Sequence, residues 1–444
     1  MRLSPAAALF LGYFLLSLVG GVILYLPPMH TGGVSFGDAL FTATSAVCVT
    51  GLIVVDTATA WTPLGKLVLA TLIQIGGLGY MTLGAVLFAA VGAKGSLRAR
   101  RMVAMSLGAP GLGGVLGLAR KVVVAAIVVE ILAVFPLWLV FGRDFGVLVG
   151  LGHAVFHSIS ALNNAGFSTF STSLTAYASE PLVNVVILLL IVVGGIGFKV
   201  WRDVWAYARG SLRRFDLHDR LVFTATVLLI VGGFLAFLLF EPAVREGGVS
   251  AMFWKSLFAA ITPRTAGFNT VDYSQMSPFG RVLTMGLMFV GGSPGGTAGG
   301  IKTVTAAVVF LWLLNTLKGR ENVFVFKRTL PRSVVVKAFQ TFILAIAVFW
   351  IWLLLLSLLE GRVIERAGFL NFTFEVMSAF GTVGLSAGSV SKANVSLVAD
   401  FSFAGRILVM LAMIIGRAGY IVFAASLIRT VRSPFKYAEE EVLV

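Results

Sequence analysis

The stretch VCVTGL at residues 47–52 recurs in altered form three more times, and this repetition decides the fold. The other copies are LNNAGF at 162–167, PRTAGF at 263–268 and FGTVGL at 380–385. In each copy Ala, Val or Thr precedes the glycine and a large apolar residue follows it. Ten residues before the glycine stands Phe41, Phe156, Leu257 or Phe374. Repetition at this spacing indicates a chain built from copies of one structural unit.

A second spacing, independent of the first, repeats with it. Pro63, Pro181, Pro278 and Phe403 each open an apolar segment, and thirteen residues later come Gly76-Gly77, Gly194-Gly195, Gly291-Gly292 and Gly416-Arg417. A long apolar run also precedes each glycine stretch. We therefore predict a repeated unit consisting of a long helix M1, a short helix P, a glycine loop and a helix M2.

The composition is that of a membrane protein. Hydrophobic residues make up 58% of the 444 residues and charged residues 12%, against about 25% charged in soluble domains. Runs of the roughly 20 apolar residues that cross a bilayer occur at Ala6–Leu26, Val122–Phe141, Leu221–Phe240 and Ala338–Leu359. The first run is expected to be a retained helix, because it is too long for a signal peptide and Leu26-Pro27-Pro28 follows it without a small-residue cleavage site.

Segment P has about 11 residues, which is half a membrane span, so it must enter and leave through the same face. Non-helical backbone at that depth must line a cavity or be buried in protein, and four such loops imply a shared axis. We expect an all-α integral membrane protein with eight transmembrane helices and four re-entrant pore helices in a pseudo-fourfold arrangement around one pore. The expected divisions are repeat 1 at 1–93, repeat 2 at 94–210, repeat 3 at 211–319, repeat 4 at 320–430 and a tail at 431–444.

The net charge of +15 reflects basic loops. Lys and Arg cluster at 94–121, 199–220 and 318–337, with more at Arg2 and in the tail. By the positive-inside rule these loops and both termini are predicted to be cytoplasmic, so the charge needs no nucleic-acid partner. Cys48 is the only cysteine, which excludes an intrachain disulfide, and the four histidines have no metal-ligand spacing.

The glycine loops suit a cation filter. Such a filter replaces the hydration shell of the ion with rings of backbone carbonyls, and glycine adopts the required backbone angles without a Cβ penalty. The C-terminal end of each P helix also carries about half a negative charge toward the centre. A single glycine would be explained by close helix packing, but four copies in register favour the filter.

The third M2 helix contains GGSPGGTAGG at 291–300. Six glycines and a proline in ten residues cannot hold a regular helix, and we expect this break where the other M2 helices continue. A loop there would obstruct the ion pathway. The stretch partly matches a nucleophile elbow and a phosphate-binding loop, but no strand precedes it, so we predict that the chain is not an enzyme.

Four kinds of charged residue remain. Arg417 lies inside a membrane helix, which marks a functional candidate, and its position predicts contact with the carbonyls of the 291–300 stretch or repulsion of a resident cation. Lys302 either lies at the end of that stretch or extends to the membrane surface. Asp56 and Asp272 each follow a loop glycine by five residues and either attract cations or cap loops. Glu130 and Glu375 lie within or near apolar segments, where a basic partner for Glu375 is possible.

These four loops, with the stretch 291–303, resemble the Trk/Ktr/HKT superfamily of potassium transporters over nearly the whole chain, and the compact Ktr membrane subunit (KtrB type) in particular. In that family glycine in every loop accompanies preference for potassium. The resemblance assigns the filter to Val49, Thr50, Gly51, Asn164, Ala165, Gly166, Thr265, Ala266, Gly267, Thr382, Val383 and Gly384, with K+ bound at backbone carbonyls. It assigns the gate to Gly291, Gly292, Ser293, Pro294, Gly295, Gly296, Thr297, Ala298, Gly299, Gly300, Lys302 and Arg417. Cys48, Asn163, Arg264 and Gly381 share one position without an assigned role.

The resemblance also implies potassium uptake across the plasma membrane, passive or sodium-dependent. It implies a homodimer, a cytoplasmic ring of nucleotide-binding (RCK-type) regulatory subunits, and no cofactor bound by this chain. The alternative that stays open is a secondary ion-coupled transporter with a substrate site at the bilayer midplane, a class that also uses broken helices.

Overall fold

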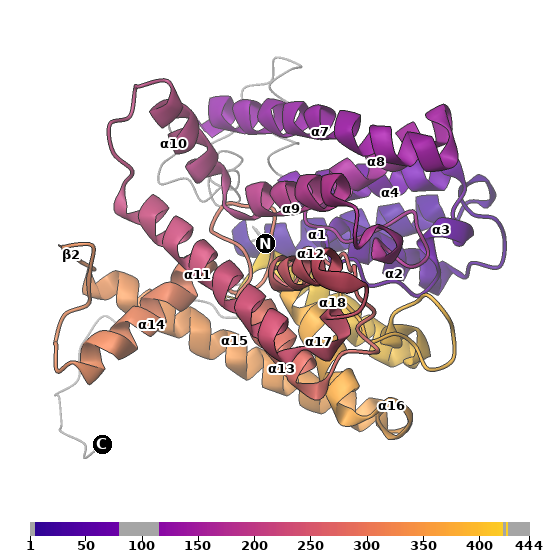
Figure 1. Cartoon of the computed structure of the whole chain (residues 1–444). Helices are drawn as coiled ribbons and strands as arrows, with labels where there is room; N and C mark the ends of the chain where they lie inside the picture. The colour runs from indigo at the N-terminus through magenta and orange to yellow at the C-terminus, as the bar shows by residue number, and fades with distance from the viewer. Residues whose placement is uncertain (1–4, 80–114, 421–422, 425–444) are drawn as a thin grey trace.

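The computed structural model describes residues 5–79, 115–420 and 423–424 (Figure 1). Four long apolar helices run through this part of the chain: α1 (Pro5–Leu24), α7 (Val115–Phe145), α11 (Leu217–Phe240) and α15 (Arg332–Leu359). By length and composition these four can cross a membrane, and α9 (Pro181–Gly195) with α10 (Phe198–Ala208) adds a fifth span if that bent pair counts as one. The expected boundary at 93/94 and the expected tail at 431–444 lie outside the described residues.

Shorter helices surround the four glycine stretches. Those that end just before a glycine are α2 (Phe36–Val47), α8 (Val147–Leu162), α12 (Gly248–Ile261) and α17 (Phe369–Gly381). Those that follow are α4 (Pro63–Leu78), α9, α13 (Pro278–Phe289) and α18 (Phe403–Ala418). The helices α1, α7 and α11 pack along α2, α8 and α12, respectively. The helices after the loops have only 12–16 residues in the described ranges. Within those ranges four helices, or five with the bent pair, are long enough to cross a membrane, against the eight spans expected.

Three of the helices that follow the loops begin with the same local structure. A Ser or Thr side chain accepts a hydrogen bond from the backbone N–H three residues later, which satisfies one of the free donors at a helix start. The pairs are Thr62 with Gly65, Ser277 with Gly280, and Ser402 with Gly405. An added Cβ on these glycines would collide with Met29 O, Glu241 Oε2 and Glu360 Oε1, respectively. The patterns TPLG, SPFG and SFAG therefore set the start and the close packing of α4, α13 and α18.

Breaks in the helices after the loops are more frequent than the sequence predicted. The axes of α9 and α10 differ by 105°, and Gly197 at the break has φ 95°. The expectation of a continuous second M2 helix is therefore wrong. Glycines with positive φ also end α4 and α18, namely Gly79 (φ 81°) and Gly419 (φ 94°). Glycine takes this left-handed conformation at helix ends without a Cβ penalty, and Figure 1 shows α10 turning away from the line of α9.

The remaining elements are short apart from α14 (Thr303–Leu317), which follows the 291–303 loop. They are η1 (Pro27–Met29), α3 (Thr57–Ala60), η2 (Thr175–Tyr177), η3 (Pro242–Val244), α16 (Gly361–Ala367) and η4 (Leu397–Asp400). An antiparallel hairpin, β1 (Phe324–Val325) with β2 (Arg328–Thr329), joins α14 to α15. These are the only strands in the described ranges, so the helical fold class holds apart from this hairpin.

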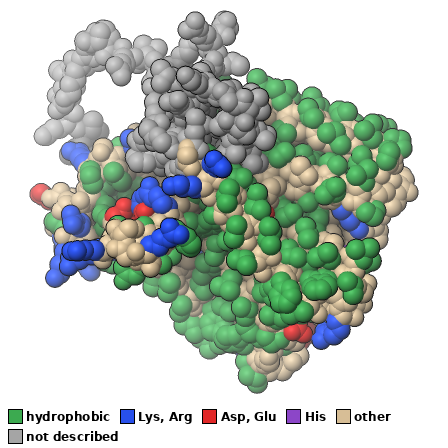
Figure 2. All heavy atoms as spheres, turned by 90° about the horizontal axis from the view of Figure 1, so that it is seen from above, with side chains coloured by type: hydrophobic (Ala, Val, Ile, Leu, Met, Phe, Trp, Pro, Cys, Tyr) green, Lys and Arg blue, Asp and Glu red, His purple; other side chains and the backbone are tan. Residues whose placement is uncertain are grey.

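The surface separates apolar and basic regions. Figure 2 shows hydrophobic side chains over most of the visible face, with most of the visible Lys and Arg at the left end and a few on the opposite side. Large apolar side chains on the long helices are among the exposed residues, for example Ile131, Leu228 and Leu354. A soluble protein rarely exposes apolar surface on this scale, so the molecule presents its long helices to lipid.

Candidate functional site

The glycine loops, residues 49–51, 164–166, 265–267 and 382–384, share one unusual backbone conformation. Their glycines have positive φ angles: Gly51 93°, Gly166 69°, Gly267 81° and Gly384 90°. So do the residues two positions earlier: Val49 55°, Asn164 57°, Thr265 71° and Thr382 52°. Positive φ is a genuine outlier for a β-branched residue such as Val or Thr. Such strain persists only where the surrounding structure enforces it, and it is typical of functional sites.

The four loops contact one another in a cycle. An added Cβ on Gly166 would lie 2.7 Å from Ala266 O, and the corresponding additions on the other three glycines would collide with a carbonyl of a neighbouring loop. The four pairs are Gly51 with Ala165 O, Gly166 with Ala266 O, Gly267 with Val383 O, and Gly384 with Thr50 O. Each loop therefore touches the next and the last touches the first, a spacing that only glycine allows.

The short helices hold the loops from behind. The N–H groups of Gly51 and Gly384 each donate to a serine hydroxyl, Ser45 and Ser378, at 3.0 Å. In the other two loops the hydroxyl is the donor, from Ser160 to Phe167 O (2.8 Å) and from Thr262 to Phe268 O (2.5 Å). In all four repeats a hydroxyl of the preceding helix, or of the residue that ends it, therefore fixes the backbone at the glycine or at the residue after it.

Three buried hydroxyls at the loops have no hydrogen-bond partner among the described residues: Thr50 Oγ1, Thr265 Oγ1 and Thr382 Oγ1. Buried polar atoms are normally satisfied. The hydroxyl of Thr382 lies against Gly299 of the 291–303 loop, since an added Cβ on Gly299 would collide with it. Hydroxyl and carbonyl oxygens are the ligand type that a hard monovalent cation requires.

A cavity of about 850 Å³ opens on one side of the loops and includes all four loop glycines in its lining. Asp56 and Asp272 also line it. Each of them also caps a turn, since Asp56 accepts from Ala58 N–H (2.9 Å) and Asp272 from Ser274 N–H (2.8 Å). The expected loop capping is present at both aspartates, and attraction of cations by these two carboxylates stays a prediction.

The 291–303 loop lies on the α9 side of the glycine loops and is held by backbone hydrogen bonds. Its two ends meet through Gly291 N–H to Ile301 O (2.9 Å) and Thr303 N–H to Gly292 O (3.0 Å). Its middle binds the break between α9 and α10. The bonds there are Ser293 N–H to Gly195 O (2.8 Å), Thr297 N–H to Gly194 O (3.1 Å) and Phe198 N–H to Gly295 O (3.0 Å). The 291–303 loop is therefore bound to the end of α9 at its break. This contact was not predicted from the sequence.

Arg417 joins the 291–303 loop to two helices. From α18 its guanidinium donates to Thr297 O in the loop, and to Gly76 O (2.5 Å) and Gly77 O (2.9 Å) at the end of α4. Lys302 Nζ donates to Ala298 O at 2.8 Å, so its ammonium group remains within the loop. Arginine has several donors in a fixed planar arrangement, which suits it to bridge carbonyls from separate segments.

Among the residues left without a role, Asn163 belongs to a buried polar network. Its Nδ2 donates to Gln74 Oε1 (2.7 Å) and to Glu130 Oε1 (3.2 Å), while Gln74 Nε2 donates to Glu130 Oε2 (3.2 Å). This network joins α4 and α7 behind the second glycine loop. In the third repeat Arg264 instead lies near the hydroxyls of Thr226 and Thr303 (3.4 and 3.5 Å).

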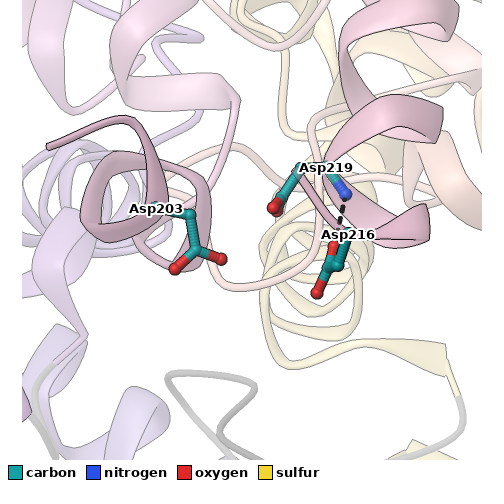
Figure 3. A group of neighbouring side chains, drawn as sticks. All are labelled: Asp203, Asp216 and Asp219. Atoms are coloured by element: carbon teal, nitrogen blue, oxygen red, sulfur yellow. Dashed lines mark hydrogen bonds between the residues drawn. The ribbon is translucent and has the colours of Figure 1, made fainter. Parts of the chain in front are cut away.

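Three aspartates whose carboxylate oxygens lie within 4.8 Å of one another form a cluster outside the glycine loops: Asp203, Asp216 and Asp219 (Figure 3). The ammonium of Lys199 contacts all three, at 2.7, 2.8 and 2.8 Å. It occupies the position that a metal ion would need, so the cluster is an ion-pair network that ties α10 to α11. This cluster was not predicted from the sequence, although Lys199 and Asp203 have the helical i,i+4 spacing.

The comparisons with known proteins agree with this architecture. The family model described as TrkH, cation transport protein, matches residues 18–434. Ktr system potassium uptake protein B of Bacillus subtilis is 37% identical over 100% of this chain and 97% of its own length. Potassium/sodium uptake protein NtpJ of Enterococcus hirae is 36% identical over 100% of this chain and 98% of its own length.

A solved structure shares the fold. The potassium transporter TrkH from Vibrio parahaemolyticus superposes with a TM-score of 0.73, covering 94% of this chain and 83% of that one, at 20% identity. Since the family model spans most of the sequence and the first two relatives match along their whole length, this chain belongs to the TrkH family of cation transport proteins.

Proposed function

We propose that this chain is the ion-translocating subunit of a potassium uptake system, with four M1–P–M2 repeats in a pseudo-fourfold arrangement around one pore. The observation that carries the proposal is the cyclic contact among the glycine loops 49–51, 164–166, 265–267 and 382–384. Four equivalent backbones that meet around one point supply rings of carbonyl oxygens. Such rings replace the hydration shell of potassium in selective pores.

The backbone angles support the choice of these twelve residues as the filter. In every loop a positive φ occurs at the glycine and again two residues earlier, so the carbonyls of successive residues can be directed toward a common axis. Thr50, Thr265 and Thr382 in three of these loops also carry buried hydroxyls without a hydrogen-bond partner among the described residues. The names of two relatives, a potassium uptake protein and a potassium/sodium uptake protein, favour K+ as the main cargo and leave a role for Na+.

In the same proposal the 291–303 loop is the gate. Its backbone rests on the broken end of α9, and Arg417 fastens Thr297 to the end of α4. A loop that is rich in glycine and held mainly by a few hydrogen bonds can change position without disturbing the packed helices around it. Release of the Arg417 contacts is the step that we propose opens the pathway.

We also propose a homodimer in the plasma membrane, with both termini in the cytoplasm and a ring of nucleotide-binding regulatory subunits on the basic side. The hairpin β1–β2 supports a docking place for such subunits, because it presents the exposed side chains of Phe326, Lys327 and Arg328 between α14 and α15. Aromatic and arginine side chains are enriched in protein contacts.

Flux measurements test the function directly. The purified protein is reconstituted into liposomes, and 86Rb+ uptake is measured in competition with potassium, sodium and lithium. The proposal predicts uptake that potassium suppresses far more strongly than sodium or lithium. Absence of alkali-cation flux from a folded preparation, or equal competition by the three ions, contradicts it. Uptake that needs an imposed sodium gradient and is unaffected by substitution of Gly51 would favour the secondary-transporter alternative, because its substrate site does not use the glycine loops.

A further inference from the structure

Glu375 is a fully buried carboxyl group in α17, nine residues before Gly384. Its Oε1 accepts a hydrogen bond from Val398 N–H at 3.0 Å, so the basic partner considered from the sequence is not what binds this oxygen. Its Oε2 has no hydrogen-bond partner in the described part of the chain. A buried carboxylate is expensive, by several kcal/mol before compensation. Its presence behind the fourth glycine loop therefore needs an explanation beyond packing.

The explanation lies in the segment Ser396–Val398, which we call the outer brace. Each of its three residues makes hydrogen bonds to a different residue: Ser396 to Ile53, Leu397 to Ser386 and Val398 to Glu375. Ser396 exchanges two hydrogen bonds with Ile53, from Ser396 N–H to Ile53 O (2.9 Å) and from Ile53 N–H to Ser396 Oγ (3.0 Å). Leu397 N–H donates to Ser386 Oγ at 3.0 Å, and Val398 N–H donates to Glu375.

The outer brace therefore spans two loop exits. Ile53 and Ser386 each stand two residues after a loop glycine, Gly51 in the first loop and Gly384 in the fourth. Glu375 fixes the third residue of the brace to α17. Moving Val398 would shift Leu397 and Ser396 with it, and hence the outer ends of two glycine loops that are themselves in contact through Gly384 and Thr50 O.

The matching position in the other repeats shows what is particular to Glu375. The residue nine positions before the loop glycine is Thr42 in the first repeat, His157 in the second and Phe258 in the third. His157 Nε2 lies 2.9 Å from Ser168 Oγ, and Ser168 also stands two residues after its loop glycine. That contact stays within one loop. Among the described hydrogen bonds Thr42 donates to Asp38 O of its own helix (2.8 Å), and Phe258 is apolar. Of these four residues Glu375 is therefore the one bonded to a segment that also reaches the first loop.

Building on the proposed function, we propose that Glu375 is a positioning residue for ion selectivity, acting through the outer brace on the exits of the first and fourth filter loops. A filter discriminates by the placement and field strength of its carbonyls, and a functional site must be held by its supporting residues to within about 0.5 Å. Loss of the Glu375 contact relaxes two of the four loops. Discrimination between potassium and sodium falls while the pathway stays open.

The test uses 86Rb+ uptake into liposomes and the ratio of the potassium and sodium concentrations that halve it. Glu375→Ala is expected to lower the preference for potassium by roughly tenfold, the size expected for one lost charge-assisted hydrogen bond. Glu375→Gln keeps an oxygen that can accept from Val398 N–H, so it retains an intermediate preference. Ser396→Ala, which removes the acceptor of Ile53 N–H, lowers the preference without altering Glu375.

The matched control is Glu360→Gln. Glu360 is also a buried carboxyl in the fourth repeat, but it accepts from Ser402 N–H (3.0 Å) and Ser402 Oγ–H at the start of α18. The Glu360→Gln protein is expected to lose thermal stability and to keep the wild-type ion preference. Wild-type preference in folded Glu375→Ala and Ser396→Ala proteins overturns this inference and leaves the proposed function intact. A wild-type protein without any preference for potassium overturns the proposed function instead.

Discussion

Gly384 lies so close to Thr50 that an added Cβ would collide with the Thr50 carbonyl oxygen. This contact joins the last glycine loop to the first, although the two are separated by most of the chain. It completes the cycle begun by Gly51 with Ala165, Gly166 with Ala266, and Gly267 with Val383. The glycines are therefore required twice, once for their own positive φ and once to let the neighbouring carbonyl approach.

The substitution Gly51→Ser tests this double requirement. Its side chain would meet Ala165 O, and φ 93° is strained for serine, so the first and second loops must separate. We expect the preference for potassium over sodium to fall in 86Rb+ competition experiments. Gly286→Ser is the control, because Gly286 in α13 has ordinary helical φ and open space around it. Unchanged ion preference in folded Gly51→Ser protein would contradict the assignment.

Cys48 supplies a reporter of this packed region. It is the only cysteine in the chain, it is fully buried, and it stands three residues before Gly51. A membrane-permeant fluorescent thiol reagent is therefore expected to leave the native protein in detergent unlabelled and to react in one cooperative step on heating. Rapid labelling at room temperature would mean that the first loop is not packed as described. A Cys48→Ala variant shows the background signal.

The sequence was informative about the glycine loops because each needs a residue type that few other structures demand. The repeated spacing of Gly51, Gly166, Gly267 and Gly384 carries that constraint directly. The 291–300 stretch was identifiable for the same reason, since its composition forbids a helix. The positive φ angles of Val49, Thr265 and Thr382 could not be foreseen, because Val and Thr avoid that conformation elsewhere and accept it here only under tertiary constraint.

Interactions between distant elements were the other part that the sequence did not reveal. The partners of Arg417 are backbone carbonyls on α4 and in the 291–303 loop, and any residue type has a backbone carbonyl. The bend at Gly197 depends on the same loop, because Phe198 N–H finds Gly295 O instead of a continuing helix. The ion pairs of Lys199 could not be predicted because they join α10 to α11, and the sequence does not show that these two helices lie side by side.

The Lys199 cluster predicts an unusual dependence of stability on pH. Burial alone would raise the pKa of Asp216, but hydrogen bonds from Lys199 and from Asp219 N–H outweigh it and lower the pKa to about 2 from the usual 3.8. Because the folded pKa is below the unfolded one, the ionised carboxylate stabilises the wild-type protein above about pH 4. That contribution is lost as the pH falls through the interval toward 2.

Lys199→Met removes the cation shared by three carboxylates that lie within 4.8 Å of one another, and leaves among the described residues only the salt bridge from Arg202 Nε to Asp203 (2.8 Å). Their repulsion is expected to lower the melting temperature at pH 7.5, and protonation relieves it on acidification. The variant should therefore become more stable between pH 7.5 and pH 5, where the wild type changes little through this cluster. Thermal melts followed by tryptophan fluorescence measure the melting temperatures of the wild type and the variant at each pH. The control is Lys255→Met, which loses a hydrogen bond to Glu246 O and should show no increase in melting temperature on acidification. Parallel profiles of melting temperature against pH for the wild type and Lys199→Met would contradict the ion-pair network.

Deletion of Ser293–Ala298 tests the gate by removing the segment that rests on α9. We expect 86Rb+ flux into liposomes to rise, because the backbone that obstructs the pathway is gone while the glycine loops remain. The ion preference should stay as in the wild type. Folding of the deleted protein is checked by the Cys48 thiol melt, since the deletion also removes the donors to Gly194 O and Gly195 O. Flux equal to or below that of the wild type in folded protein counts against a gating role.

Arg417→Gln tests the same gate without shortening the chain. The guanidinium holds Thr297 O against Gly76 O and Gly77 O, and a glutamine amide is too short and has too few donors to bridge all three. We expect higher flux with unchanged preference among alkali cations, because the loop is released and the filter is untouched. Arg406→Gln is the control: it removes an arginine from the other end of α18, where its partner is Asp38 at 2.9 Å. Loss of these hydrogen bonds can only make a gate that they hold closed open more easily. Reduced flux in Arg417→Gln with normal thiol melting would therefore contradict the gate and show that the arginine supports the conducting state.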